Sequence, residues 1–76
     1  MPIDEIVEIV EIFAANHPGV MLYIVVKDKN GEEETRRMKE ANDLYREMKQ
    51  DPDNLHPALL NWRANWINRG GGEPPF

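Results

Sequence analysis

The sequence predicts one small α+β domain in which two antiparallel strands pack against three helices, in the order α-β-β-α-α. Three observations predict this class. Residues 20–26 form an uninterrupted apolar run of strand length. Asn30-Gly31, shortly after it, is the dipeptide most typical of a β-hairpin turn. Apolar residues recur at helical spacing in three other segments, which are 3–15, 38–50 and 57–68.

The first helix is expected over residues 3–15 because apolar residues recur there three and four positions apart. These residues are Ile3, Ile6, Val7, Val10, Phe13 and Ala14. Between them, Glu5, Glu8 and Glu11 recur every third residue and would form an acidic edge of the helix. Inward side chains of a regular strand recur every second residue, so this period argues against a strand. The Pro-Gly pair at 18–19 should end the helix.

Residues 20–26 read VMLYIVV and predict a strand that is covered on both faces. Such a strand needs a neighbour for its backbone groups. A two-residue turn at Asn30-Gly31 would supply one over residues 32–37. The turn would pair Lys29 with Glu32, Asp28 with Glu33 and Lys27 with Glu34. Opposite charges in the first and last of these pairs favour the hairpin.

An alternative interpretation begins a helix at Asn30. Glu32 and Glu33 would then form ion pairs with the arginines four residues later, one helical turn away. The order of elements would become α-β-α-α. The strand at 20–26 would have to pair with the same strand of a second copy, so this interpretation predicts a homodimer.

Two helices follow under either interpretation. Residues 38–50 place apolar side chains on one face and charged side chains on the other. The segment 51–54, DPDN, ends that helix. Pro57 suits the first position of a last helix, which three consecutive glycines end. We therefore assign residues 1–69 to a single domain and 70–76 to a flexible C-terminal tail.

Composition excludes several classes of function. The chain has 76 residues, with 14 acidic and 9 basic ones and a net charge of -5. It lacks Cys and Ser, which excludes a disulfide scaffold, a cysteine zinc site and Ser or Cys nucleophiles. The negative charge argues against direct nucleic-acid binding. No apolar run reaches the roughly 18 residues that span a membrane, and no signal-peptide pattern is visible. We expect a soluble protein, cytoplasmic or otherwise intracellular, without catalytic residues, cofactors or metals.

The two histidines give only a weak metal signal. His17 and His56 each precede a proline in a predicted loop. Asp51 and Asp53 could join His56, but these residues lack the ligand spacing of a typical zinc site. The same segment departs from the calcium-binding EF-hand loop after its first acidic residues. Loop or capping roles are therefore expected for both histidines.

The last helix carries the candidate binding site. Apolar residues cover more of its surface than one neighbour in a small fold would bury. One stripe, which we expect to face the core, consists of Leu60, Ala64 and Ile67. The partner-binding candidates on the other side are Leu59, Trp62, Arg63, Trp66 and Arg69. Because Trp and Arg are enriched at the energetic centres of interfaces, we predict a non-enzymatic protein–protein interaction module, a small acidic binder, inhibitor or adaptor.

Two other functions remain open. Both tryptophans could fill the core, which would leave a structural or de novo designed protein with no ligand. Regular turn sequences and helical charge patterning are typical of designed chains, whereas the Trp- and Asn-rich last helix is not, so natural and designed origins both remain. In the second alternative, the acidic residues imitate nucleic acid and inhibit a nucleic-acid-binding protein. The acidic residues concerned are Glu5, Glu8, Glu11 and the run 32–34.

Overall fold

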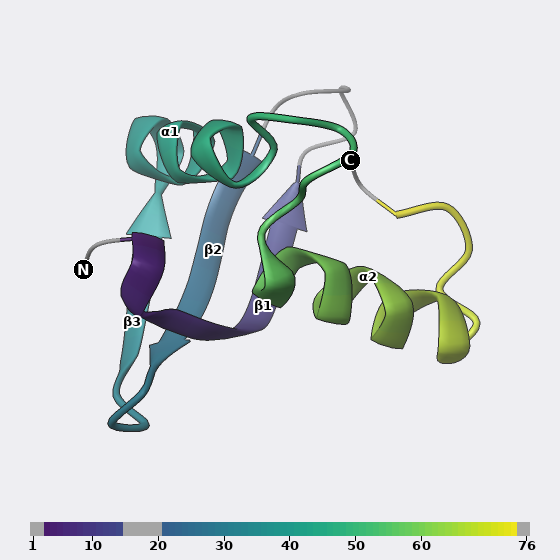
Figure 1. Cartoon of the computed structure of the whole chain (residues 1–76), viewed down its shortest axis with the longest axis horizontal. Coiled ribbons are helices and arrows are strands. Elements are labelled where there is room, and N and C mark those ends of the chain that lie inside the picture. Colours follow the sequence, from purple (N-terminus) through teal and green to yellow (C-terminus); the bar gives the residue numbers. More distant parts are fainter. Residues whose placement is uncertain (1–2, 15–20, 75–76) are drawn as a thin grey trace.

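The computed structural model describes residues 3–14 and 21–74. Within these ranges the elements are the 3-10 turn η1 (Ile3–Glu5), the strands β1 (Ile6–Ala14), β2 (Met21–Asp28) and β3 (Glu33–Arg37), and the helices α1 (Met38–Met48) and α2 (Pro57–Asn68). The strands form an antiparallel sheet in the order β1-β2-β3 (Figure 1). The predicted α+β class, the hairpin and the last two helices are confirmed. The predicted turn at 18–19 lies outside the described residues.

The predicted first helix is wrong, because residues 6–14 form the strand β1. The register of β1 against β2 shifts at three places, and at two of them the extra residue, Val7 or Val10, lies on β1. Each extra residue is a β-bulge, which lengthens the interval between inward side chains from two residues to three. The inward residues are Ile6, Ile9 and Ile12. A period of three therefore belongs here to a twice-bulged strand, and the many β-branched residues favour that strand.

The hairpin between β2 and β3 has a three-residue loop. The carbonyl of Asp28 accepts a hydrogen bond from the N–H of Gly31 (3.0 Å), and the N–H of Asp28 donates to the carbonyl of Glu32 (3.0 Å). Gly31 has a φ of 81°, which a glycine adopts without strain. The carboxylate of Asp28 also accepts hydrogen bonds from the N–H groups of Asn30 (2.8 Å) and Glu32 (2.9 Å). These bonds fix a type I turn followed by a bulge.

The predicted two-residue turn is therefore wrong by one residue. Lys27 lies opposite Glu33, and Val26 lies opposite Glu34. A shift of one residue changes which side chains share a face of the sheet. The alternative order α-β-α-α is also wrong, because residues 33–37 form a strand and β2 pairs with neighbours on both sides within the chain.

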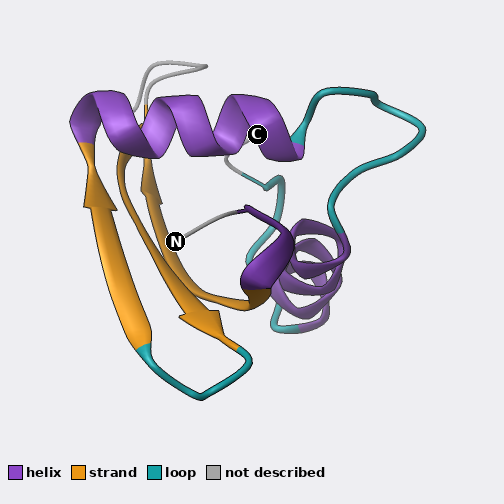
Figure 2. Ribbon diagram, turned by 60° about the vertical axis from the view of Figure 1, so that its left-hand side comes forward, coloured by secondary structure: helices purple, strands orange, loops and turns teal. Residues whose placement is uncertain are grey.

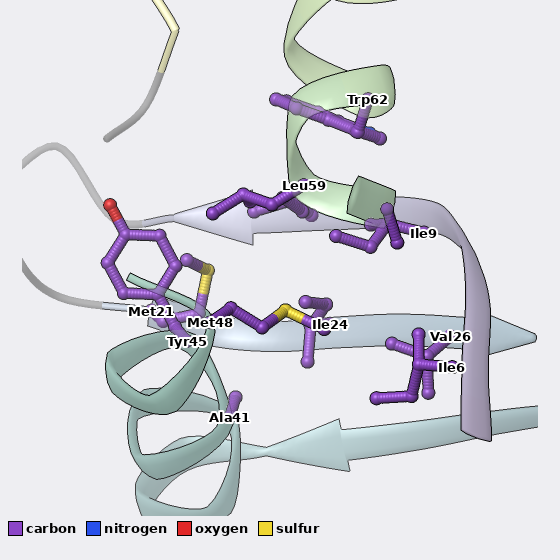
Figure 3. Close-up of a cluster of buried hydrophobic side chains, with 12 residues drawn as sticks. Ile6, Ile9, Met21, Ile24, Val26, Ala41, Tyr45, Met48, Leu59 and Trp62 are labelled. Atoms are coloured by element: carbon purple, nitrogen blue, oxygen red, sulfur yellow. The ribbon is translucent and has the colours of Figure 1, made fainter. Parts of the chain in front are cut away.

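The core lies between the two helices and one face of the sheet (Figure 3). The sheet contributes Ile6, Ile9, Ile12, Met21, Ile24 and Val26. The helices contribute Ala41, Tyr45, Met48, Ala58, Leu59 and Trp62. Helix α1 crosses one end of the sheet and α2 lies beside β1 (Figure 2). Since both helices join one cluster, no described helix covers the opposite face of the sheet.

Asn42 of α1 fixes the beginning of β2. Its side-chain oxygen accepts a hydrogen bond from the N–H of Met21 (3.0 Å). Its Nδ2 donates to the carbonyls of Met21 (3.4 Å) and Met38 (3.2 Å). One amide therefore satisfies both backbone groups of a buried residue at the point where β2 begins. This places α1 on the sheet and leaves α2 to be positioned by the loop before it.

Candidate protein-binding site

His56 determines where α2 begins. Its Nδ1 accepts a hydrogen bond from the N–H of Ala58 (3.1 Å), so it acts as the N-cap of the helix. Its Nε2 lies 3.1 Å from the carbonyl oxygen of Ile3. Because Nδ1 accepts this bond it carries no proton, so the proton of the neutral ring is on Nε2, which donates to the carbonyl of Ile3. Both ring nitrogens are thus used by backbone groups, in the capping role expected from the sequence, while His17 lies outside the described residues.

The first half of α2 packs against β1 through a face that we call the inner stripe, consisting of Ala58, Leu59 and Trp62. Leu59 is 0% exposed and Trp62 is 6% exposed. These two predicted partner-binding residues therefore belong to the core and offer no surface to a partner. The physical reason is the strand β1, whose inward isoleucines supply an apolar surface beside α2 that a helix over residues 3–15 would not have placed there (Figure 3).

Trp66 continues the inner stripe but lies past the centre of the core. Its ring stacks on that of Trp62, with ring centroids 5.1 Å apart. The guanidinium of Arg69 lies 5.6 Å from the centroid of the Trp66 ring, within cation–π range. The ring nitrogen of Trp66 is buried and has no hydrogen-bond partner among the described residues. Trp66 and Arg69 thus form one half-covered cluster at the end of the helix.

The glycines after α2 are part of the helix end. Gly70 has a φ of 73° and its N–H donates to the carbonyl of Ile67 (3.0 Å). The N–H of Gly71 donates to the carbonyl of Trp66 (3.0 Å). This pair of bonds is a Schellman motif, which satisfies the last carbonyls of the helix. Gly71 also passes so close to Trp66 that an added Cβ would lie 2.6 Å from the ring. The hydrogen bonds that end the helix therefore reach Gly70 and Gly71, the first two residues of the segment predicted to be a flexible tail.

The opposite side of α2 presents an apolar surface, which we call the outer stripe, consisting of Leu60, Ala64 and Ile67. Leu60 is 42% exposed and Ile67 is 54% exposed. We predicted that this stripe would face the core, and that prediction is wrong. Helix α2 runs from β1 away from the sheet (Figure 1), and all three residues of its outer stripe are exposed.

Charge separates α2 from the rest of the protein. Residues 57–69 contain Arg63 and Arg69 and no acidic residue, whereas the whole chain has a net charge of -5. Arg63 follows Leu60 by three positions, so it flanks the outer stripe, and its side chain is half-buried. The arrangement is an apolar strip beside a positive charge, on a helix whose other face is anchored.

Metal-binding clusters and membrane-spanning helices can both be checked among the described residues. These residues include no group of three or more His, Cys, Asp or Glu side chains that could hold a metal ion. None of the described helices has the length and apolar content to cross a bilayer. No protein-family model matches the chain, and no curated protein or solved structure matches it either. Function is therefore argued from the surfaces themselves.

Proposed function

We propose that the chain is a non-enzymatic protein-interaction module that places the outer stripe of α2 into an apolar groove on another protein. The observation that carries the proposal is the exposure of Leu60 and Ile67 on a helix whose opposite face is already held by the core. Apolar residues at positions i, i+4 and i+7 are a recurring way for a helix to bind a groove. Because Leu59 and Trp62 anchor the helix, binding requires little further ordering, and this lowers its entropic cost.

The arginines specify the chemistry of the partner. Arg63 lies beside the outer stripe, and Arg69 is held over Trp66 at the end of the same helix. A groove with acidic residues on its rim would complement this positive charge. The acidic remainder of the chain would repel such a rim elsewhere, which favours approach through α2. We therefore expect association to slow as the salt concentration rises.

The test is to select binders to the chain from a displayed library of small proteins and to map where they bind. Each independent binder is measured against the unmodified chain, Ile67→Glu and Asn61→Glu by biolayer interferometry. Both positions are exposed on α2, but only Ile67 belongs to the outer stripe. We expect most binders to lose affinity by at least about tenfold with Ile67→Glu and by less than about twofold with Asn61→Glu.

Thermal unfolding of both variants controls for damage to the fold. Exposed sites away from packing contacts usually change stability by no more than about 0.5 kcal/mol, so the melting temperatures should stay close to that of the unmodified chain. Binders spread evenly over the protein, with no excess sensitive to Ile67→Glu, would contradict the proposal. That result would favour the alternative in which α2 serves the fold alone.

A further inference from the structure

The face of the sheet opposite the helices is exposed, and it carries several large apolar side chains. On β1, Val7 is 55% exposed, Val10 is 41% exposed and Phe13 is 49% exposed. Val7 and Val10 are the extra residues of the two β-bulges, so the bulges themselves bring these side chains out of the core. Exposed apolar side chains gathered on one face mark interaction surfaces.

The strand register arranges the outward side chains of this face into three rows that cross the strands. The first row is Glu8, Lys27 and Glu33, the middle row is Glu11, Val25 and Thr35, and the last row is Phe13, Tyr23 and Arg37. The bulges add Val7 to the first row and Val10 to the middle row. We call these three rows the outer sheet face. The first row is charged and the last is aromatic, while the middle row holds Val10 and Val25.

The last row is organised by Tyr23. Its ring stacks on Phe13 with centroids 5.5 Å apart, and its hydroxyl donates a hydrogen bond to Glu11 (2.9 Å). The hydrogen bond to Glu11 raises the pKa of Tyr23, and the positive charge of Arg37 opposes this rise. Glu11 therefore leans from the middle row toward the last row. Its carboxylate is thus displaced from the centre of the face.

We propose that the outer sheet face packs against the same face of a second copy of the chain, about a two-fold axis that runs along the middle row. Such an axis places each strand of one copy over the same strand of the other copy. It also places the first row of one copy over the last row of the other. Glu33 of one copy then faces Arg37 of the other, and Lys27 faces the ring of Tyr23. Val10 and Val25 each meet their own counterparts at the centre. Two sheets packed in this way lie about 10 Å apart with their strands nearly aligned.

Charge complementarity selects this axis. An axis parallel to the strands would place Glu8 over Glu33 and Lys27 over Lys27, which is repulsive at both positions. The axis along the middle row places Glu33 of one copy against Arg37 of the other. This pair of opposite charges occurs twice, because a two-fold interface repeats every contact. The same axis also keeps the two Glu11 carboxylates apart, since each leans toward its own Tyr23 and lies near Lys27 of the other copy. The outer sheet face is thus complementary to itself in both charge and apolar surface.

The test measures molecular mass by sedimentation equilibrium over a wide range of concentrations. We expect the unmodified chain to dimerise reversibly. Glu33→Arg and Arg37→Glu should each weaken the dimer by at least about tenfold, because each places like charges together across the axis. The double variant Glu33→Arg with Arg37→Glu restores opposite charges and should recover most of the affinity. A merely structural effect of either substitution would not be rescued in this way.

A second pair of variants separates this surface from α2. Val10→Lys places two positive charges at the axis and should leave only monomer, whereas Leu60→Lys on the outer stripe should leave the dimer intact. Both positions are exposed, so both variants should fold, and circular dichroism is the measurement that checks this. A chain that stays monomeric at all concentrations overturns the proposal. So does a dimer lost with Leu60→Lys but not with Val10→Lys, or a double charge exchange that fails to rescue.

Discussion

Replacing His56 by alanine should destabilise the protein, although His56 lies outside the buried core. The imidazole makes two hydrogen bonds: it accepts a local one from the N–H of Ala58, and it donates one to the carbonyl of Ile3, which is distant in the sequence. Loss of an N-cap costs about 1 kcal/mol, and loss of a part-buried hydrogen bond costs about another 1 kcal/mol. His56→Ala should therefore lower the free energy of unfolding by about 2 kcal/mol. For a domain of this size that corresponds to a fall in melting temperature of about 8–16 °C.

The matched variant is His56→Asn, since asparagine is a good N-cap but is too short to reach Ile3. It should cost about half as much as His56→Ala. Urea unfolding followed by tryptophan fluorescence measures both values, because Trp62 lies in the buried first half of α2 and reports the loss of packing. Nitrogen chemical shifts of His56 should show the proton on Nε2. A His56→Ala variant within about 0.5 kcal/mol of the unmodified chain would refute the reasoning.

Further predictions concern three other places in the structure. Glu11→Gln should lower the raised pKa of Tyr23 toward its ordinary value of 10.0, measured by ultraviolet titration of the phenol. The hydrogen bond to Glu11 contributes its full stabilisation below pH 10.0, and this contribution is lost as the pH rises through the raised pKa of Tyr23. A titration of Tyr23 that is unchanged in Glu11→Gln would contradict the contact. Gly71→Ala should push the backbone at residue 71 off the Trp66 ring, because an added Cβ would lie too close to it. We expect the tryptophan fluorescence to shift to the red and the free energy of unfolding to fall by about 1 kcal/mol. An unshifted spectrum would show that residue 71 does not cover the ring. Met38 has a φ of 52°, so Met38→Gly should stabilise the chain by up to about 1 kcal/mol in urea unfolding, and a loss of stability would show that this backbone is not strained.

The hairpin and the last two helices could be predicted because local signals specify them. Asn30-Gly31 marks the turn, and Pro57 marks the start of α2. The one-residue error in the turn arose from Asp28, whose side chain accepts two backbone hydrogen bonds and makes a three-residue loop. A sequence pattern does not reveal that preference, because a two-residue turn at the same dipeptide satisfies the same propensities.

The first strand and the inner face of α2 could not be predicted, for a shared reason. A helix and a twice-bulged strand both bury every third residue of β1, so the pattern alone does not separate them. Helix α2 carries apolar stripes on opposite sides, and only the position of β1 decides which stripe is buried. The sequence pattern therefore placed the outer stripe in the core, and it counted Leu59 and Trp62, which the structure buries, among the partner-binding candidates.

The bulges in β1 also determine which kinds of assembly the chain can form. Strand β2, which is mostly apolar and carries three β-branched residues, has the composition of segments that stack into cross-β fibrils. It is the central strand, so both of its edges are occupied. Of the two edges left open, β1 is distorted by its bulges, and β3 is short and mostly charged. Neither edge is a regular template for another strand. Growth of the sheet by strand addition is thus disfavoured on both sides, which leaves the face-to-face association that we propose, and such a two-fold contact would close at two copies.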